Sequence, residues 1–266
     1  MILGSAMNLP NVIAGFGVGA AVGMTGVGGG SLMTPILVLL FGFAPTTAVG
    51  TDLWFAAITK VVGGGLHNRK GTVDWQVLRR MCLGSIPASI ATLIWMDLTR
   101  HAQSSHGTIV HALGAVLLLT AVAMLARKKI QSFAVRLRTT TADAFMRAQP
   151  WLTVLAGAVL GVIVPLTSVG AGALGTVMLL YLYPLRMTPT RLAGTDIVHA
   201  VPLATIAGIG HLLMGNVDVG LLLNLLIGSI PGIIVGTLVA TKSPDMVLRA
   251  AIAMILVFVS IKLLFS

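Results

Sequence analysis

Ten apolar segments separated by short polar turns make up most of this 266-residue chain and restrict the folds open to it. Hydrophobic residues account for 56% of the sequence and charged residues for 9%, against roughly 25% charged residues in a soluble domain. Inside a bilayer every backbone N–H and C=O must find a partner within the protein, so each segment is expected to be a helix. The sequence therefore predicts an all-α polytopic membrane protein. The segments fall at 9–24, 28–43, 48–66, 76–96, 107–126, 151–166, 168–184, 192–213, 219–240 and 246–265.

The net charge of +10 does not indicate a nucleic-acid-binding protein, because the basic residues lie between apolar segments instead of forming a patch. An excess of Lys and Arg is typical of the cytoplasmic loops of membrane proteins. The most basic region, 127–150, contains six such residues and a single acid, Asp143. We therefore predict a first transmembrane repeat at 1–126, a basic cytoplasmic linker at 127–150 and a second transmembrane repeat at 151–266.

The two predicted halves repeat one another in sequence. The triplet Gly-Thr-Asp at Gly50–Asp52 recurs at Gly194–Asp196, and Gly-Ser-Ile-Pro at Gly84–Pro87 recurs at Gly228–Pro231. Compositional bias alone does not reproduce such motifs in the same order, and self-similarity at a fixed spacing indicates an internal duplication. We therefore expect two copies of one structural unit.

The second copy is expected to enter the membrane from the opposite side, because about five segments per half is an odd number. A cytoplasmic linker then places the N- and C-termini outside. Of the 17 Lys and Arg residues, all but Lys60, Arg100 and Lys262 fall on the cytoplasmic side of this arrangement. The sequence thus predicts two inverted-topology repeats, a design in which transporters place their binding sites near the midplane.

The first two segments of each half are short for a membrane span. A helix of about 16 residues rises roughly 24 Å, less than the roughly 30 Å hydrocarbon core. They are therefore either tilted helices or re-entrant pairs whose tips lie near mid-depth, and non-helical backbone at that depth must line a cavity or be buried in protein.

A glycine-rich break separates the short segments of each half. The stretch Thr25–Thr34 reads T-G-V-G-G-G-S-L-M-T, and Thr167–Thr176 reads T-S-V-G-A-G-A-L-G-T. A break ahead of a new helix exposes backbone N–H groups and a positive helix end, an arrangement that binds anions. The alternative is close helix packing through small residues. The candidate substrate-binding residues are Thr25, Gly28, Gly29, Gly30, Ser31, Thr167, Ser168, Gly170 and Gly172.

Two matched acids, Asp52 and Asp196, lie inside apolar segments, where an acid usually faces the bundle interior and has a partner. They are candidates for gating or proton handling, the alternative being a capping carboxylate near the interface. His199, deeper in the same segment as Asp196, is a candidate proton relay.

Three further polar residues lie in these segments and are candidates for substrate binding. Thr51 and Thr195 precede the two acids, and either bind substrate oxygens or bond back to their own helices. Lys60 has no basic counterpart in the second half and attracts the anion, pairs with an acid or extends its ammonium to the interface. The matched acids Asp74 and Asp218 follow turns and are predicted to cap the next helix.

The sequence contains no pattern that indicates an enzyme or a metal site. Neither G-x-S-x-G nor H-E-x-x-H occurs, and the histidines have no accompanying Cys/His/acid cluster with zinc spacing. The one cysteine, Cys82, excludes an internal disulfide. We therefore expect a protein that is not an enzyme and has no cofactor and no metal.

In combination, four motifs of this chain resemble the TauE/SafE sulfite-exporter family of membrane permeases. They are G-x-G-G-G-S at 26–31, P-T-T-A-V-G-T-D at 45–52, G-T-V-D-W at 71–75 and the repeated G-S-I-P. The resemblance covers nearly the whole chain apart from the central linker and the ends. It implies export of sulfite or a small sulfonate-type anion across a bacterial-type inner membrane by two repeated halves.

The resemblance places the family's glycine motif on Gly28–Ser31 and its Gly-Thr-Asp motif on Gly50–Asp52. The second copy departs from the glycine motif, because Ala171 and Ala173 replace Gly29 and Ser31. This difference favours the first break as the dominant anion site.

The combined expectation is a multi-pass secondary transporter that exports sulfite or a related small anion by alternating access. Its partners would be the anionic substrate and the lipid bilayer, with no nucleic acid and with a homo-oligomer left open. The alternative is an anion channel, or a permease for another small oxyanion or carboxylate.

Overall fold

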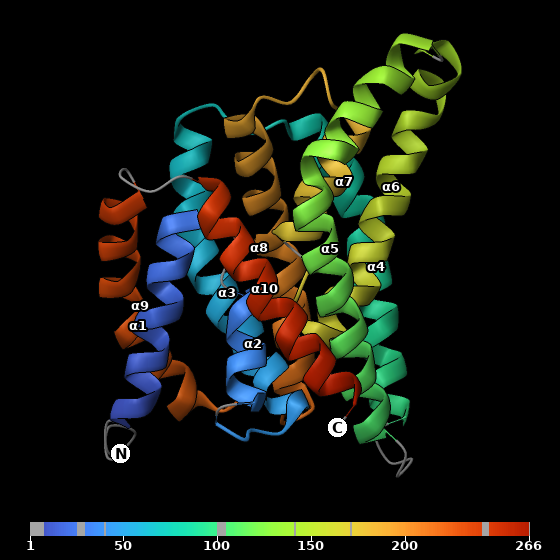
Figure 1. Cartoon of the computed structure of the whole chain (residues 1–266). Coiled ribbons are helices and arrows are strands. Elements are labelled where there is room, and N and C mark those ends of the chain that lie inside the picture. Colours follow the sequence, from blue (N-terminus) through green and yellow to red (C-terminus); the bar gives the residue numbers. More distant parts are fainter. Residues whose placement is uncertain are drawn as a thin grey trace.

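The computed structural model describes residues 8–25, 30–39, 41–99, 105–140, 142–170, 172–240 and 245–265. Within these ranges the chain forms ten helices and no strand (Figure 1), which confirms the all-α prediction for the described part. The helices are α1 Leu9–Thr25, α2 Gly30–Leu39, α3 Pro45–Arg69, α4 Trp75–Thr99, α5 Ser105–Thr140, α6 Ala142–Thr167, α7 Ala173–Leu182, α8 Pro189–Leu213, α9 Val219–Ala240 and α10 Asp245–Leu264.

Large apolar side chains cover the outside of the bundle, as expected for a protein embedded in a membrane. Leu83, Trp151 and Ile230 are each more than half exposed, and soluble monomers rarely present apolar surface on this scale. Among the described residues, four helical stretches are long and apolar enough to cross a bilayer. They are Trp75–Thr99, Phe145–Thr167, Pro189–Leu213 and Val219–Gly236.

Helices α2 and α7 are half-length elements. Each contains ten residues, which corresponds to a rise of about 15 Å, or half of the roughly 30 Å hydrocarbon core. Neither described stretch is long enough to cross a bilayer on its own. Both lie inside the bundle: Met33 and Leu37 of α2 and Leu179 of α7 are fully buried.

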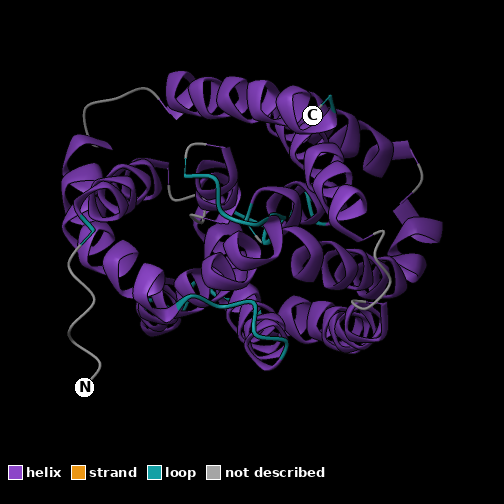
Figure 2. Cartoon of the chain, turned by 90° about the horizontal axis from the view of Figure 1, so that it is seen from below, coloured by secondary structure: helices purple, strands orange, loops and turns teal. Residues whose placement is uncertain are grey.

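Helices α3 and α8 lie side by side in the middle of the bundle, and each belongs to a different half of the sequence. The indole N–H of Trp54 on α3 donates a 2.9 Å hydrogen bond to the carbonyl of Gly208 on α8. Helix α1 packs mainly on α9, and α4 mainly on α6. Figure 2, seen from below, shows some helices nearly end-on and others running obliquely across the bundle.

The α1–α9 and α4–α6 contacts involve matched glycines. A Cβ on Gly84 of α4 would overlap the backbone of Val154 on α6, and a Cβ on Gly228 of α9 would overlap that of Val12 on α1. Small residues let helix backbones approach closely in membranes. The repeated Gly-Ser-Ile-Pro motif therefore has a packing role in both halves, at its first residue.

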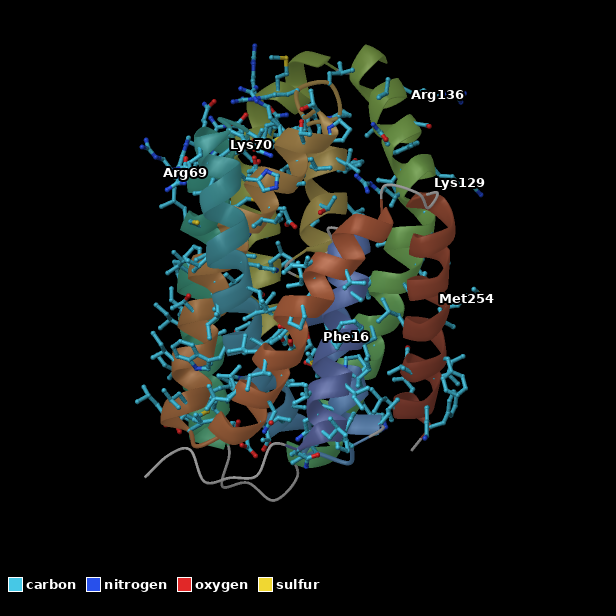
Figure 3. The ribbon with its side chains drawn as sticks, turned by 90° about the vertical axis from the view of Figure 1, so that its left-hand side faces the viewer. Phe16, Arg69, Lys70, Lys129, Arg136 and Met254 are labelled. Atoms are coloured by element: carbon cyan, nitrogen blue, oxygen red, sulfur yellow. The ribbon has the colours of Figure 1, made fainter. Side chains whose placement is uncertain are left out.

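The two ends of the bundle differ in charge. The α5–α6, α3–α4 and α7–α8 connections lie at one end, whereas α1 begins and α10 ends at the other (Figure 1). Arg69, Lys70 and Arg136 lie toward the first end, while Phe16 and Met254 lie on the outer side of the bundle nearer its middle (Figure 3). We call the first end the basic end and the other the opposite end. The region 127–150, predicted as a linker, is helical where it is described. Its first part belongs to α5 and its last part to α6.

Candidate functional site

The second glycine break is a tight turn between α6, which ends at Thr167, and α7, which begins at Ala173. Its backbone has positive φ angles at Ser168 (56°), Gly170 (116°) and Gly172 (138°). Glycine adopts these conformations without the steric cost that a side chain brings. The glycines of this break are therefore required by the turn itself.

The break leaves backbone donors open at the start of α7. The N–H of Gly175 bonds to the carbonyl of Gly170 at 3.0 Å, and that of Thr176 to Gly172 at 3.4 Å. The N–H groups of Ala173 and Leu174 have no acceptor within the described part of the chain, and no side chain caps the helix. Such open donors at a positive helix end are suited to an anion.

The two hydroxyl residues of this break have different surroundings. Thr167 Oγ1 donates to the carbonyl of Ile163 at 2.8 Å and accepts from the N–H of Val169 at 3.1 Å, so it shapes the turn. Ser168 is 5% exposed, and its Oγ has no hydrogen-bond partner among the described residues. It lies near the Asp52 carboxylate of the other half. Of the two hydroxyls of this break, only that of Ser168 makes no hydrogen bond within the described ranges.

Part of the first break lies outside the described residues. Gly28 and Gly29 fall there, whereas Thr25 ends α1 and Gly30 and Ser31 begin α2. The prediction that this break is the dominant anion site therefore stays a prediction.

Asp52 on α3 and Asp196 on α8 are both buried, at 0% and 3% exposure. Thr34 Oγ1 of α2 donates to Asp52 Oδ2 at 2.6 Å. Thr176 Oγ1 of α7 lies 3.3 Å from Asp196 Oδ2 and shares its one proton between this carboxylate and the carbonyl of Gly172. Each acid is thus bonded by a threonine near the start of the short helix of its own half. The Oδ1 atom of each acid has no hydrogen-bond partner within the described ranges.

Glycine makes room for one of these contacts. A Cβ on Gly175 would overlap Asp196 Oδ1, so the carboxylate rests directly on the backbone of the first turn of α7. A negative group near a helix N-terminus is favoured by the helix dipole. The protein's own acid and a bound anion would therefore share the same positive field.

Lys60 lies on α3 and is 7% exposed. It interacts electrostatically with both Asp196 and Asp52. This burial places the Lys60 side chain in the interior, within electrostatic range of the two acids, and argues against the alternative that it extends to the interface. Lys60 is therefore the cation of a mixed-charge cluster with Asp52 and Asp196.

His199 completes this cluster. It lies one helical turn after Asp196 on α8, is fully buried and is within electrostatic range of Lys60. Its Nε2 lies 2.9 Å from Ser85 Oγ on α4, while its Nδ1 has no partner among the described residues. Ser85 is not among the predicted site residues, because the repeated Gly-Ser-Ile-Pro motif indicates a duplicated structural element and gives no sign of a histidine partner.

Thr51 and Thr195 are predicted either to bind substrate or to bond to their own helices. Each instead bonds to the start of a helix in the other half. Thr51 Oγ1 accepts from the N–H of Asp218 at 3.1 Å, and Thr195 Oγ1 accepts from the N–H of Asp74 at 2.9 Å. Both bonds cross from one half of the chain to the other. The two hydroxyls therefore connect α3 to the start of α9, and α8 to the start of α4.

The predicted helix caps are confirmed. Asp74 Oδ1 accepts from the N–H of Val77 at 3.2 Å, and Asp218 Oδ1 accepts from that of Leu221 at 2.9 Å. No group of three or more His, Cys, Asp or Glu within the described ranges is arranged to hold a metal ion.

Comparison with known proteins agrees with this picture. The family profile described as Sulfite exporter TauE/SafE matches residues 11–263. The "Probable membrane transporter protein YjnA" of Bacillus subtilis (strain 168) is 38% identical over 269 residues, which cover 97% of this chain and 100% of that protein. The "Probable membrane transporter protein YdhB" of the same organism is 28% identical over 255 residues, covering 96% and 99%. No solved structure matches the chain.

Proposed function

The chain belongs to the sulfite exporter TauE/SafE family, and we propose that it is a secondary transporter that exports sulfite or a small sulfonate across a bacterial-type inner membrane. Its relatives are named probable membrane transporter proteins, and the helices described above suit a membrane-embedded protein. The substrate, the direction and the mechanism belong to the proposal.

The observation that carries the proposal is the start of α7 inside the protein. Two open backbone N–H groups, at Ala173 and Leu174, lie next to the break that holds the buried hydroxyl of Ser168. An anion leaving water loses its hydration shell, which is costly unless hydrogen bonds replace it. These donors would supply the replacement, with Lys60 adding positive charge.

Two inverted repeats are part of the same proposal. The matched contacts support them: Thr34–Asp52 with Thr176–Asp196, and Thr51–Asp218 with Thr195–Asp74. We assign the basic end to the cytoplasm because cytoplasmic loops carry the excess of Lys and Arg. Alternating access would then arise from a rearrangement of the helices around α3 and α8.

The buried acids suggest how transport is gated. Asp196 rests on the first turn of α7, so a substrate anion bound there would oppose the charge of the carboxylate. Two negative groups close together in a low-dielectric interior are unfavourable unless a proton accompanies them. Asp52, Asp196 and His199 are therefore the proposed proton-handling groups.

The test is flux in proteoliposomes that contain the purified chain. Sulfite, a taurine-type sulfonate and chloride are offered separately, with and without a pH gradient. Saturable flux of sulfite or the sulfonate, faster in the presence of the gradient, is the expected result. Absence of saturable flux for every such anion would contradict the proposal, and a large flux that does not saturate would favour the channel alternative.

A further inference from the structure

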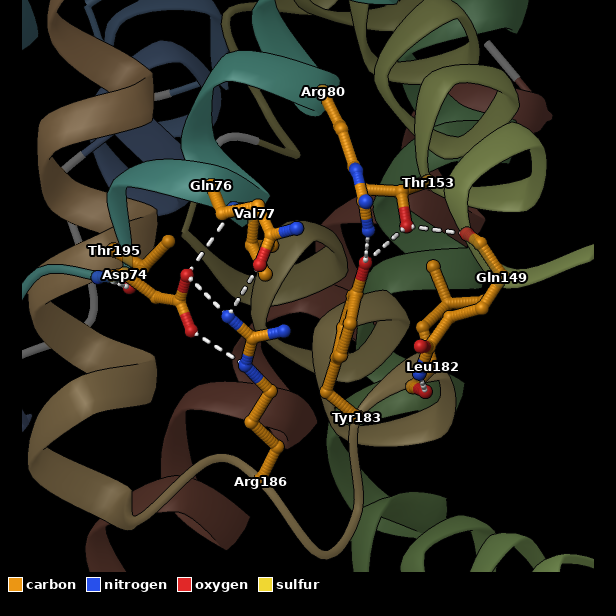
Figure 4. A network of polar contacts seen from close by, with 10 residues as sticks. All are labelled: Asp74, Gln76, Val77, Arg80, Gln149, Thr153, Leu182, Tyr183, Arg186 and Thr195. Carbon is orange, nitrogen blue, oxygen red and sulfur yellow. Dashed lines mark hydrogen bonds and ion pairs between the residues drawn. The ribbon is translucent and has the colours of Figure 1, made fainter. Parts of the chain in front are cut away.

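The connection between α7 and α8 is tied to the start of α4 by an ion pair (Figure 4). Arg186 Nε donates to Asp74 Oδ2 at 2.8 Å, and its Nη2 donates to Asp74 Oδ1 at 3.0 Å. The same Nη2 donates to Gln76 Oε1 at 2.9 Å. Such paired bonds between a guanidinium and a carboxylate fix geometry more firmly than a single contact.

A second set of contacts holds the same connection to α6. The Tyr183 hydroxyl lies 2.7 Å from Thr153 Oγ1, and Gln149 Nε2 donates to the carbonyl of Leu182 at 2.6 Å. The Arg186 guanidinium stacks over the Tyr183 ring at 5.7 Å. The C-terminal end of α7 is thus fixed by Tyr183 to α6 and by Arg186 to α4.

The two partners of the ion pair differ in exposure. The Asp74 side chain is 5% exposed, whereas the Arg186 side chain is 41% exposed. A fully exposed pair contributes little to stability, and a fully buried one loses its hydration. This pair lies between the two cases, so it is strong enough to hold a connection and weak enough to break.

The opposite end of the bundle has no equivalent ion pair in the described part of the chain. Asp218 repeats the helix cap of Asp74 and its bond to a threonine of the other half. The stretch that matches Arg186, at Phe41–Ala44, contains no charged residue. The two halves therefore share the capping acid and differ in the cation that contacts it.

We infer that the Arg186–Asp74 pair is a one-sided latch that closes the basic end and must open for substrate to reach the start of α7 from that side. The inference deepens the proposed transport function. Helix α7 is only ten residues long, with the candidate anion site at its first turn and the latch just beyond its last. Releasing Arg186 would let this short helix move away from α4.

The experiment measures access to the first turn of α7 directly. Ala173→Cys is introduced into a Cys82→Ser chain, so that the protein has a single thiol, at a residue 4% exposed. A membrane-impermeant thiol reagent is then added to vesicles from the basic side or from the opposite side. The labelling rate from each side reports how often the site opens to it.

The test variant is Asp74→Asn, and the matched control is Asp218→Asn. Asparagine caps a helix about as well as aspartate, so both variants keep the cap, while only the first breaks an ion pair. We expect Asp74→Asn to raise labelling from the basic side by about fivefold or more, the lower end of typical conformational coupling. Asp218→Asn should leave the rate from either side unchanged.

Arg186→Gln removes the same ion pair from its other partner, and it tests the latch even if Asp74→Asn does not fold. It should reproduce the increase, and the double variant should add nothing further, because both changes remove one interaction. Unchanged labelling in the folded single variants, or an equal increase in Asp218→Asn, would overturn the latch. The readout needs no substrate, so a parent chain without saturable flux of either sulfite or the sulfonate would contradict the transport proposal and leave the latch test valid.

Discussion

Asp52 and Asp196 occupy equivalent positions in the two halves, but the threonine contacts to their carboxylates differ in length. The bond from Thr34 to Asp52 is 2.6 Å, whereas that from Thr176 to Asp196 is 3.3 Å. Lys60 lies within electrostatic range of both acids and has no cationic counterpart, since its matched position is Ala204. The two acids therefore occupy symmetric positions, whereas the nearby positive charge, Lys60, comes from the first half alone.

We predict that Thr34→Val destabilises the protein more than Thr176→Val does. Valine keeps the shape of threonine and removes the donor, and a hydrogen bond to a charged group contributes about 1.5–3 kcal/mol. The shorter bond should account for the larger loss. Thermal unfolding in detergent measures the difference, with Thr205→Val as control because that hydroxyl bonds only to its own helix, at Val201. Equal shifts for all three variants would contradict this prediction.

Ser168→Ala should weaken substrate binding without lowering stability. The Ser168 hydroxyl is buried near the Asp52 carboxylate and makes no hydrogen bond of normal geometry among the described residues, so its removal breaks no formed bond. We expect an unchanged melting temperature and a KM for sulfite raised about fivefold, which corresponds to one net hydrogen bond of about 1 kcal/mol. Ser229→Ala, which removes a bond within α9, is the control for KM. A lower melting temperature with unchanged KM would assign Ser168 to the fold.

At the scale of the elements, the positions of the helices follow from the apolar segments, and each described helix overlaps one of them. The start of α7 is also predictable, because the glycine break and the next apolar run are adjacent in sequence. The bond between Ser85 and His199 and the pair formed by Arg186 and Asp74 are not predictable in this way. Each joins residues more than a hundred positions apart, so the contact depends on how the helices pack.

Gly175→Ala tests how closely α7 must approach α8. A Cβ at this position would overlap Asp196 Oδ1, so either the carboxylate or the short helix must shift. We expect transport to fall about tenfold, because the donors of Ala173 and Leu174 would move relative to the acid, and a displacement of about 1 Å at a reacting site can have an even larger effect. Flux per correctly folded protein is the measurement.

The control for this change is Gly17→Ala on α1, where a Cβ would meet nothing within 4 Å. Alanine in place of glycine stabilises a helix by about 0.5–1 kcal/mol when space allows. Gly17→Ala should therefore retain flux and unfold at the same or a slightly higher temperature. Equal flux in the two variants would show that the α7–α8 contact tolerates displacement.

At the scale of the whole molecule, the duplicated sequence and the uneven distribution of basic residues both predict two oppositely oriented halves. The matched side-chain bonds agree with a duplication, but they do not by themselves give the orientation of each copy in a bilayer. Arg69 and Leu213 end α3 and α8 at matched positions, both exposed, and therefore report on the orientation directly.

We predict that cysteines at these two positions are labelled from opposite sides of the membrane. In a Cys82→Ser chain, Arg69→Cys should react with an impermeant thiol reagent only from the cytoplasmic side, and Leu213→Cys only from outside. Arg136→Cys, which lies toward the basic end with Arg69, provides the cytoplasmic reference (Figure 3). Labelling of both matched positions from one side would exclude inverted repeats. Alternating access would then lack the symmetry-related pair of conformations that inverted repeats provide around the central helix pair.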